Sequence, residues 1–168
     1  MCDISQFFKK YVIIYDIMQE REEKIMICAF FGHREVIDDV KKAVKNRILN
    51  LIQNYSDIEF YVGNSGAFDK ITQGVVSDIQ KQGISVSLSV VLAYANEAPA
   101  FGYDNETIFP WELDNVLPRF AISKRNDWIL NRADIVIVYV RHRFSNSYKI
   151  MQKAIKKGLT VINIADDL

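Results

Sequence analysis

The sequence predicts an α/β domain in which a mainly parallel sheet of five strands is covered by helices on both faces. Short apolar runs alternate with stretches of helical periodicity, which is the pattern of consecutive βαβ units. The chain has 168 residues, 49% of them hydrophobic, which is enough for one domain with a sizeable core. Its 21 basic side chains balance 21 acidic ones, so the net charge is zero and no overall positive field favours binding to nucleic acid or to an anionic membrane.

The first two predicted strands flank an amphipathic helix. Residues 25–31 form a continuous apolar run that ends at Gly32, as expected of a strand buried on both faces. Apolar residues then recur at helical spacing through residues 36–54. The second strand covers residues 58–62. A right-handed crossover through the helix makes the two strands parallel.

A second helix, a third strand and a long excursion follow. Apolar residues between Phe68 and Ile79 lie on one helical face, and the helix ends at Gly83, a residue type that is common at this position. Residues 86–92 are the third strand. Residues 96–118 hold all three prolines and no sustained periodicity, so we expect this excursion to close over a functional site.

The last third of the chain repeats the alternation. Residues 119–132 predict a helix, residues 135–140 a fully buried strand, residues 146–157 a helix and residues 159–164 the last strand. The whole pattern predicts a three-layer Rossmann-like fold with strand order 3-2-1-4-5, counted along the chain. We assign residues 25–168 to this single domain.

Residues 1–24 precede the domain as an N-terminal extension. They carry aromatic and aliphatic side chains at helix-like spacing, followed by a charged run. Two interpretations stay open: a helical arm that contacts a second subunit in a homodimer or higher homo-oligomer, or a poorly ordered leader. The sequence lacks a signal-peptide cleavage site, an apolar run of about 20 residues and cysteines at metal or redox spacing. We therefore expect a soluble cytoplasmic protein without a membrane partner.

A ligand site is expected at the carboxyl ends of the strands, because loops diverge and helix N-termini converge there in open parallel sheets. Candidate binding residues lie in the turns after the first, second and fourth strands. They are Gly32, His33 and Arg34, then Gly63, Asn64, Ser65, Gly66 and Asp69, and then Ser145, Asn146 and Ser147. The first and fourth strands are neighbours in the predicted order, which brings their turns together.

The turn over residues 63–66 opens a helix, so its amide groups and the helix dipole could accept a phosphate. Asp69, in the first turn of the same helix, could accept hydrogen bonds from a ribose hydroxyl. Each feature also has a structural interpretation: glycine permits unusual backbone angles, Ser65 caps the helix, and a carboxylate favours a helix N-terminus. Both interpretations stay open.

Basic and polar side chains accompany the other two turns. Arg34 offers a bidentate fork for a phosphate or carboxylate, and His33 offers a donor or a proton carrier. Residues 145–147 can cap the helix that follows or donate to an anion, whereas residues 141–143 are more often a solvated charge run. No metal-ligand spacing, GxSxG elbow or Walker motif occurs, so we expect neither a metal nor another cofactor.

Several short motifs follow one another along the chain. They are Phe30–Arg34, Tyr61–Gly63 with Gly66–Asp69, Val91–Tyr94, Thr107–Glu112, Pro118–Ile122, Arg125-Asn126 with Trp128, Lys157-Gly158 and Val161–Ile164. In this order they resemble the YpsA-like branch of the SLOG superfamily, Rossmann-like proteins related to the LOG and DprA families. The resemblance covers residues 25–165.

This resemblance implies a nucleotide-related ligand and adds Phe68, Arg119, Arg125 and Asn126 to the candidate binding residues. One departure concerns the turn after the fourth strand, where relatives place a glycine pair and this chain has Phe144–Ser147. Without glycine, the backbone cannot approach a phosphate as closely. The PGGxGTxxE motif of the phosphoribohydrolases is also missing, which argues against their activity.

Three functions are compatible with these observations. We favour a nucleotide-binding module that senses or sequesters a phosphate-bearing small molecule, as in the bacterial and phage conflict systems of this superfamily. One alternative is a hydrolase for an N-glycosidic or phosphoester bond, with Asp69, Glu97 or Glu112 as acid or base. The other is a protein-interaction domain with a vestigial pocket. The aromatic candidates for base stacking are Tyr94, Phe120 and Trp128, although aromatic residues more often belong to the core.

Overall fold

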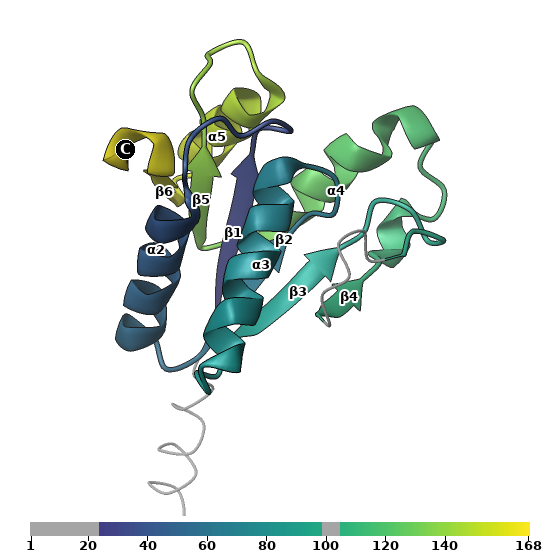
Figure 1. The fold of residues 1–168 in the computed structure, drawn as a ribbon. Coiled ribbons are helices and arrows are strands. Elements are labelled where there is room, and N and C mark those ends of the chain that lie inside the picture. The colour runs from purple at the N-terminus through teal and green to yellow at the C-terminus, as the bar shows by residue number, and fades with distance from the viewer. Residues whose placement is uncertain (1–23, 99–104) are drawn as a thin grey trace, which may run out of the picture.

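The described strands form one parallel sheet ordered β4-β3-β2-β1-β5-β6 in the computed structural model, which describes residues 24–98 and 105–168 (Figure 1). The strands are β1 (Met26–Gly32), β2 (Ile58–Val62), β3 (Ser87–Val91), β4 (Glu106–Ile108), β5 (Ile135–Tyr139) and β6 (Thr160–Asn163). The helices are α2 (Lys41–Asn54), α3 (Ala67–Lys81), α4 (Pro118–Arg132) and α5 (Asn146–Lys156), with short 3-10 turns η1 (Trp111–Leu113) and η2 (Ile164–Asp167). This arrangement confirms the predicted fold class and strand order, with β4 as an added edge strand.

The central strand β1 is buried on both faces, which explains its continuous apolar sequence. It pairs with β2 through Cys28↔Phe60 and with β5 through Phe30↔Ile137. Successive side chains point to opposite faces, so Cys28 and Phe30 enter one core and Ala29 enters the other. Burial raises the pKa of the Cys28 thiol, which therefore stays protonated and unreactive.

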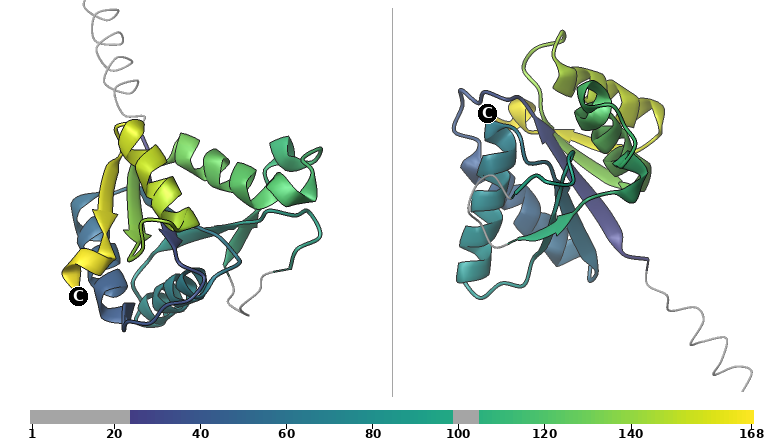
Figure 2. Two further views of the ribbon diagram at one scale, coloured as in Figure 1. Left: turned by 90° about the horizontal axis from the view of Figure 1, so that it is seen from above. Right: turned by 90° about the vertical axis from the view of Figure 1, so that its right-hand side faces the viewer.

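Two helices cover each face of the sheet. Figure 2 shows α2 and α3 on one side and α4 and α5 on the other. Val44 and Ile48 of α2 pack with Val76 of α3 in the first core, and Ile129 of α4 packs with Ala154 of α5 in the second. Their burial follows the helical periodicity of the sequence. The βαβ crossovers thus place several helix N-termini at the carboxyl edge of the sheet.

Two elements differ from the sequence prediction. The helix predicted over residues 36–54 begins at Lys41. The loop before it is attached to the end of β5 instead, because Asp38 Oδ2 accepts a hydrogen bond from the Tyr139 hydroxyl at 2.6 Å. The excursion over residues 96–118 contains β4 and η1, which the sequence did not predict. A strand of three residues is too short for its periodicity to be recognised.

The predicted extension over residues 1–24 lies, except for Lys24, outside the described residues. Within the described part, no helix has the length and apolar character that a membrane crossing requires.

Candidate functional site

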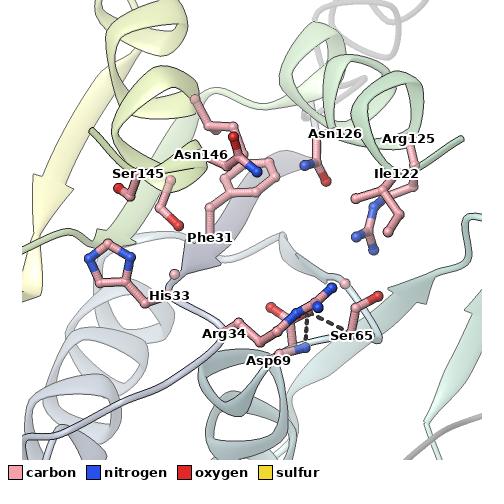
Figure 3. Close-up of a pocket in the computed structure, with 15 residues that line it drawn as sticks. Phe31, His33, Arg34, Ser65, Asp69, Ile122, Arg125, Asn126, Ser145 and Asn146 are labelled. Atoms are coloured by element: carbon pink, nitrogen blue, oxygen red, sulfur yellow. Dashed lines mark hydrogen bonds between the residues drawn. The ribbon is translucent and has the colours of Figure 1, made fainter. Parts of the chain in front are cut away.

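A cavity of about 280 Å³ lies at the carboxyl edge of the sheet, bounded by the end of β1, the β2–α3 turn, α4 and the start of α5 (Figure 3). Its lining residues are Phe31, Gly32, His33, Arg34, Gly63, Ser65, Gly66, Asp69, Ile122, Arg125, Asn126, Ser145, Asn146, Ser147 and Ile150. The three turns named from the sequence therefore share one cavity, and the Arg125-Asn126 pair of α4 faces it from the opposite side (Figure 3).

Three candidate residues lie elsewhere. Phe68 is fully buried beneath β1 and stacks on Tyr139. Asn64 is buried, and its Nδ2 donates to the carbonyl oxygen of Ala98 at 3.0 Å. Arg119 is exposed, with its guanidinium 4.8 Å from the ring centre of Phe120. None of these three side chains lines the cavity.

Glycine is required at two positions of the cavity wall because neighbouring side chains occupy the space of a Cβ atom. A Cβ at Gly32 would lie 2.3 Å from Cγ of Phe68. A Cβ at Gly63 would lie 2.4 Å from Nη1 of Arg125 and 2.8 Å from Oδ2 of Asp69. Gly63 thus lets a buried cation and a partly buried carboxyl group approach the same stretch of backbone.

The amide groups at the start of α3 are occupied by the protein itself. Oδ2 of Asp69 accepts hydrogen bonds from the amides of Ser65 at 3.0 Å and Gly66 at 3.3 Å (Figure 3). The amide of Ala67 donates to the carbonyl oxygen of Arg34 at 2.9 Å. The expectation that this turn offers unpaired amides to a phosphate is therefore wrong for Ser65 and Gly66. The Asp69 carboxyl group occupies the position at these amides that a bound anion would take.

Arg125 is buried and Asp69 is partly buried, and the loss of solvation sets the direction of both pKa shifts. Burial raises the pKa of Asp69, against the opposing effects of Arg125 and the two amide donors. Burial lowers the pKa of Arg125, against the nearby negative charges of Asp69 and Glu97. A guanidinium nevertheless stays protonated in proteins. The cavity therefore contains a permanent buried positive charge.

The hydrogen bonding of Arg125 is incomplete. The residue is only 4% exposed, and its Nη1 donates to the carbonyl oxygen of Val91 at 2.8 Å. Its Nε has no partner in the described structure. Figure 3 shows the side chain extending from α4 toward the cavity. An unsatisfied buried donor costs about 1–3 kcal/mol, so Arg125 carries hydrogen-bonding capacity that the described residues leave unused.

The start of α5 differs from the start of α3. Oγ of Ser145 accepts from the amide of Tyr148 at 3.0 Å and donates to the carbonyl oxygen of His142 at 2.8 Å. Within residues 24–98 and 105–168, the amides of Asn146 and Ser147 donate no hydrogen bond. These two amides, together with the positive end of the helix dipole, can accept an anion.

His33 and Arg34 complete the wall at the end of β1. Nε2 of His33 accepts a hydrogen bond from the amide of Arg141 at 2.9 Å, so the ring is neutral with its proton on Nδ1. Burial, followed by the nearby His142, lowers the pKa of His33 below its ordinary value. The Arg34 side chain is exposed and forms no hydrogen bond or ion pair with the described residues. Its guanidinium is therefore available to a ligand.

Three apolar lining residues were not predicted: Phe31, Ile122 and Ile150. Helical spacing could have identified two of them. Ile122 precedes Arg125 by one turn of α4, and Ile150 follows Asn146 by one turn of α5. They give the cavity an apolar side that suits a flat organic group.

The excursion does not close over this cavity within its described residues 96–98 and 105–118. The rest of it, residues 99–104, lies outside the described structure. Two proposed acid–base residues, Glu97 and Glu112, also lie outside the lining: Glu97 accepts from the amide of Ala93 at 3.1 Å, and Glu112 pairs with Arg132 at 3.2 Å.

The aromatic candidates for base stacking are used by the protein too. Trp128 stacks on Tyr61 with ring centres 6.0 Å apart, and the Tyr94 hydroxyl donates to the carbonyl oxygen of Pro118 at 3.2 Å. Neither these two residues nor Phe120 line the cavity. Among the described residues, no group of three or more His, Cys, Asp or Glu side chains is arranged to hold a metal ion.

The fold and the position of the site define an α/β protein with a Rossmann-like parallel sheet and a cavity at its carboxyl edge. The chain is similar to the X-ray structure of DNA processing protein A (DprA) from Streptococcus pneumoniae, with a TM-score of 0.58, 18% sequence identity and 82% of this chain covered. The match covers 50% of DprA, so the chain corresponds to about half of that protein. At this identity the likeness concerns the fold. No protein-family model matches the chain. No curated protein matches it either.

Proposed function

We propose that this protein is a binding module for a nucleotide or a nucleotide-derived signal, and that it belongs to the SLOG superfamily near its YpsA-like branch. The sequence motifs of that branch and the fold shared with DprA support the family assignment. DprA is named for the processing of DNA, a phosphate-bearing molecule, which is compatible with an anion site in this fold.

One observation carries the proposal: the buried guanidinium of Arg125, with its unpartnered Nε, lines the cavity onto which the unpaired amides of Asn146 and Ser147 open. A phosphate bound at the start of α5 would accept hydrogen bonds from these amides and would be attracted by the helix dipole. The exposed guanidinium of Arg34 would add a charged, bidentate contact. The apolar side of the cavity would then hold the base or sugar.

Nucleotide binding is tested by mass spectrometry of the purified protein for a co-purified ligand and by calorimetric titration with a panel of nucleotides. We expect Arg34→Ala to weaken binding by about 10- to 150-fold, since a hydrogen bond to a charged group contributes about 1.5–3 kcal/mol. Arg119→Ala is the matched control, because it removes the same charge from an exposed site outside the cavity. Equal affinities of Arg34→Ala and the unmodified protein would refute Arg34 as the anchor.

A second function, hydrolysis of an N-glycosidic or phosphoester bond, is favoured by one observation. The Asp69 carboxyl group lies in the cavity with a raised pKa, which suits a general acid. Incubation of the nucleotide panel with the protein separates the two functions: release of base or phosphate that is lost in Asp69→Asn would establish catalysis, and an unchanged bound ligand would establish a binding module. Failure of every nucleotide to bind would favour a protein-interaction domain.

A further inference from the structure

A second cavity adjoins the first at the end of β1. It measures about 290 Å³, and its lining residues are His33, Arg34, Glu35, Ile37, Tyr139, Arg141 and His142. His33 and Arg34 line both cavities, so the two spaces adjoin at this short segment of chain. A ligand that fills the first cavity therefore has a neighbouring space into which it can extend.

The second cavity is lined by two groups that can bind anions. Arg34 and Arg141 contribute guanidinium groups, the carboxylate of Glu35 also lies in the lining, and Asp38 pairs with Arg141. Arg141 is also held in place, because its Nη1 lies 3.1 Å from Oδ2 of Asp38, the oxygen that accepts the Tyr139 hydroxyl. In the described structure, Asp38 is the only partner of the Arg141 guanidinium. An arginine has five N–H donors, so most of them stay available to an anion.

His33 lies where the two cavities adjoin and is held there by a hydrogen bond. Its Nε2 accepts from the amide of Arg141, which ties the end of β1 to the end of β5. Its ring also lies 5.6 Å from the ring of His142, centre to centre. With Nε2 occupied, the proton on Nδ1 makes His33 a hydrogen-bond donor. The shared lining of the two cavities thus includes a neutral donor, which does not repel an anionic ligand.

We propose that this second cavity is a subsite for a second phosphate group, and that the ligand is a nucleotide carrying two phosphate groups. The first phosphate lies at the start of α5 and the second lies at Arg141, with the Arg34 guanidinium, which lines both cavities, between the two phosphates. This inference rests on the proposed nucleotide-binding function. Guanidinium groups match phosphate through paired N–H donors, which gives the second cavity a preference for this group over a neutral extension of the ligand.

The experiment compares adenosine, guanosine, cytidine and uridine 5′-monophosphates with the corresponding 5′-diphosphates and 3′,5′-bisphosphates, by calorimetric titration of the full chain. We expect the best ligand with two phosphates to bind at least about tenfold tighter than its monophosphate. Arg141→Ala should abolish this gain and leave the affinity for the monophosphate unchanged. Arg143→Ala is the matched control: it lies in the same exposed segment, lines neither cavity and should keep the gain.

His142→Ala provides a second variant in case the loss of the Arg141–Asp38 pair disturbs folding. His142 is exposed, so its replacement leaves the core intact, and we expect a partial loss of the gain. If monophosphates bind but the second phosphate adds nothing, or if Arg141→Ala keeps the preference, the subsite is refuted and the proposed function stands. If no nucleotide of either kind binds, the proposed function fails and the subsite fails with it.

Discussion

The β2–α3 turn and the β5–α5 turn occupy equivalent places at the sheet edge, yet they are built differently. The β2–α3 turn depends on close packing: Gly63 lies against Arg125 and Asp69, and Asp69 takes up the amides of Ser65 and Gly66. The β5–α5 turn has no glycine and is exposed, with a single side chain, Ser145, as its cap.

This difference indicates where a ligand would find hydrogen-bond donors. At α3 the protein supplies its own carboxylate, so the glycine turn that looks most like a phosphate site is already satisfied. At α5 the amides of Asn146 and Ser147 stay unpaired among the described residues. Glycine therefore serves packing at the first turn, while the second turn is the one that keeps unpaired amides, where we propose that an anion binds. Three changes to the chain test this contrast.

The largest effect is expected for Gly63→Ala. The new methyl group would displace the buried guanidinium of Arg125, whose Nη1 would lie 2.4 Å from it. Overpacking of this kind lowers the free energy of unfolding by about 1–3 kcal/mol, and we expect nucleotide binding to be lost as well. Urea denaturation and calorimetry measure the two effects.

Gly66→Ala is the control for this substitution, because the nearest atom to its Cβ is 3.3 Å away. It should lower the free energy of unfolding less than Gly63→Ala does. A Gly63→Ala protein that keeps its stability and its ligand would contradict the account of the β2–α3 turn.

Ser145→Ala should have an intermediate effect. It removes the side-chain oxygen that accepts from the Tyr148 amide at 3.0 Å. Loss of such an N-cap costs about 0.5–2 kcal/mol of the free energy of unfolding. Asn146→Ala, on the exposed residue beside it, is the control and should change stability little. Equal urea midpoints for the two variants would mean that Ser145 does not hold this turn.

The smallest effect concerns the hydrogen bond between His33 and Arg141, which joins the end of β1 to the end of β5. The pKa of His33 is lowered in the folded protein, so the unfolded chain binds a proton first as the pH falls below about 6.5. The contribution of neutral His33 to stability is complete above that pH and is lost progressively below it, down to the folded pKa. Protonated Nε2 could no longer accept from the Arg141 amide.

Urea midpoints measured between about pH 8 and 5 reveal this dependence as a difference between the unmodified protein and His33→Gln. Glutamine retains an acceptor but has no proton to gain. The unmodified protein should lose more stability than the variant across this range. Parallel profiles would show that His33 does not titrate differently in the two states.

The elements that could be predicted from the sequence are those whose local sequence pattern agrees with their burial in the folded protein. β1 and β5 are buried on both faces, so their apolar runs indicate strands without ambiguity. β4 has three residues, none fully buried, and its place at the sheet edge depends on pairing with β3, which no local pattern reports. The start of α2 likewise depends on Asp38 meeting Tyr139, a residue 101 positions away.

The candidate site was predictable in position but not in its hydrogen bonds. Topology alone brings the turns after β1, β2 and β5 to one edge. Whether an amide is free depends on side-chain orientation, since Asp69 accepts from the Ser65 amide instead of facing a sugar. Orientation also decides which residues line the cavity, since the Phe68 side chain packs against Gly32 in the core. Arg125 was named from the family resemblance, since nothing local marks an arginine of α4 as buried.

The position of Cys28 in the middle of the sheet gives the protein an internal reporter. A thiol reagent reaches this sulfur only when β1 separates from its neighbours, because the side chain is fully buried. The rate at which Cys28 is alkylated therefore measures how often the sheet opens. A nucleotide bound at the sheet edge should slow that alkylation in proportion to its occupancy, which makes binding measurable without a label on either molecule.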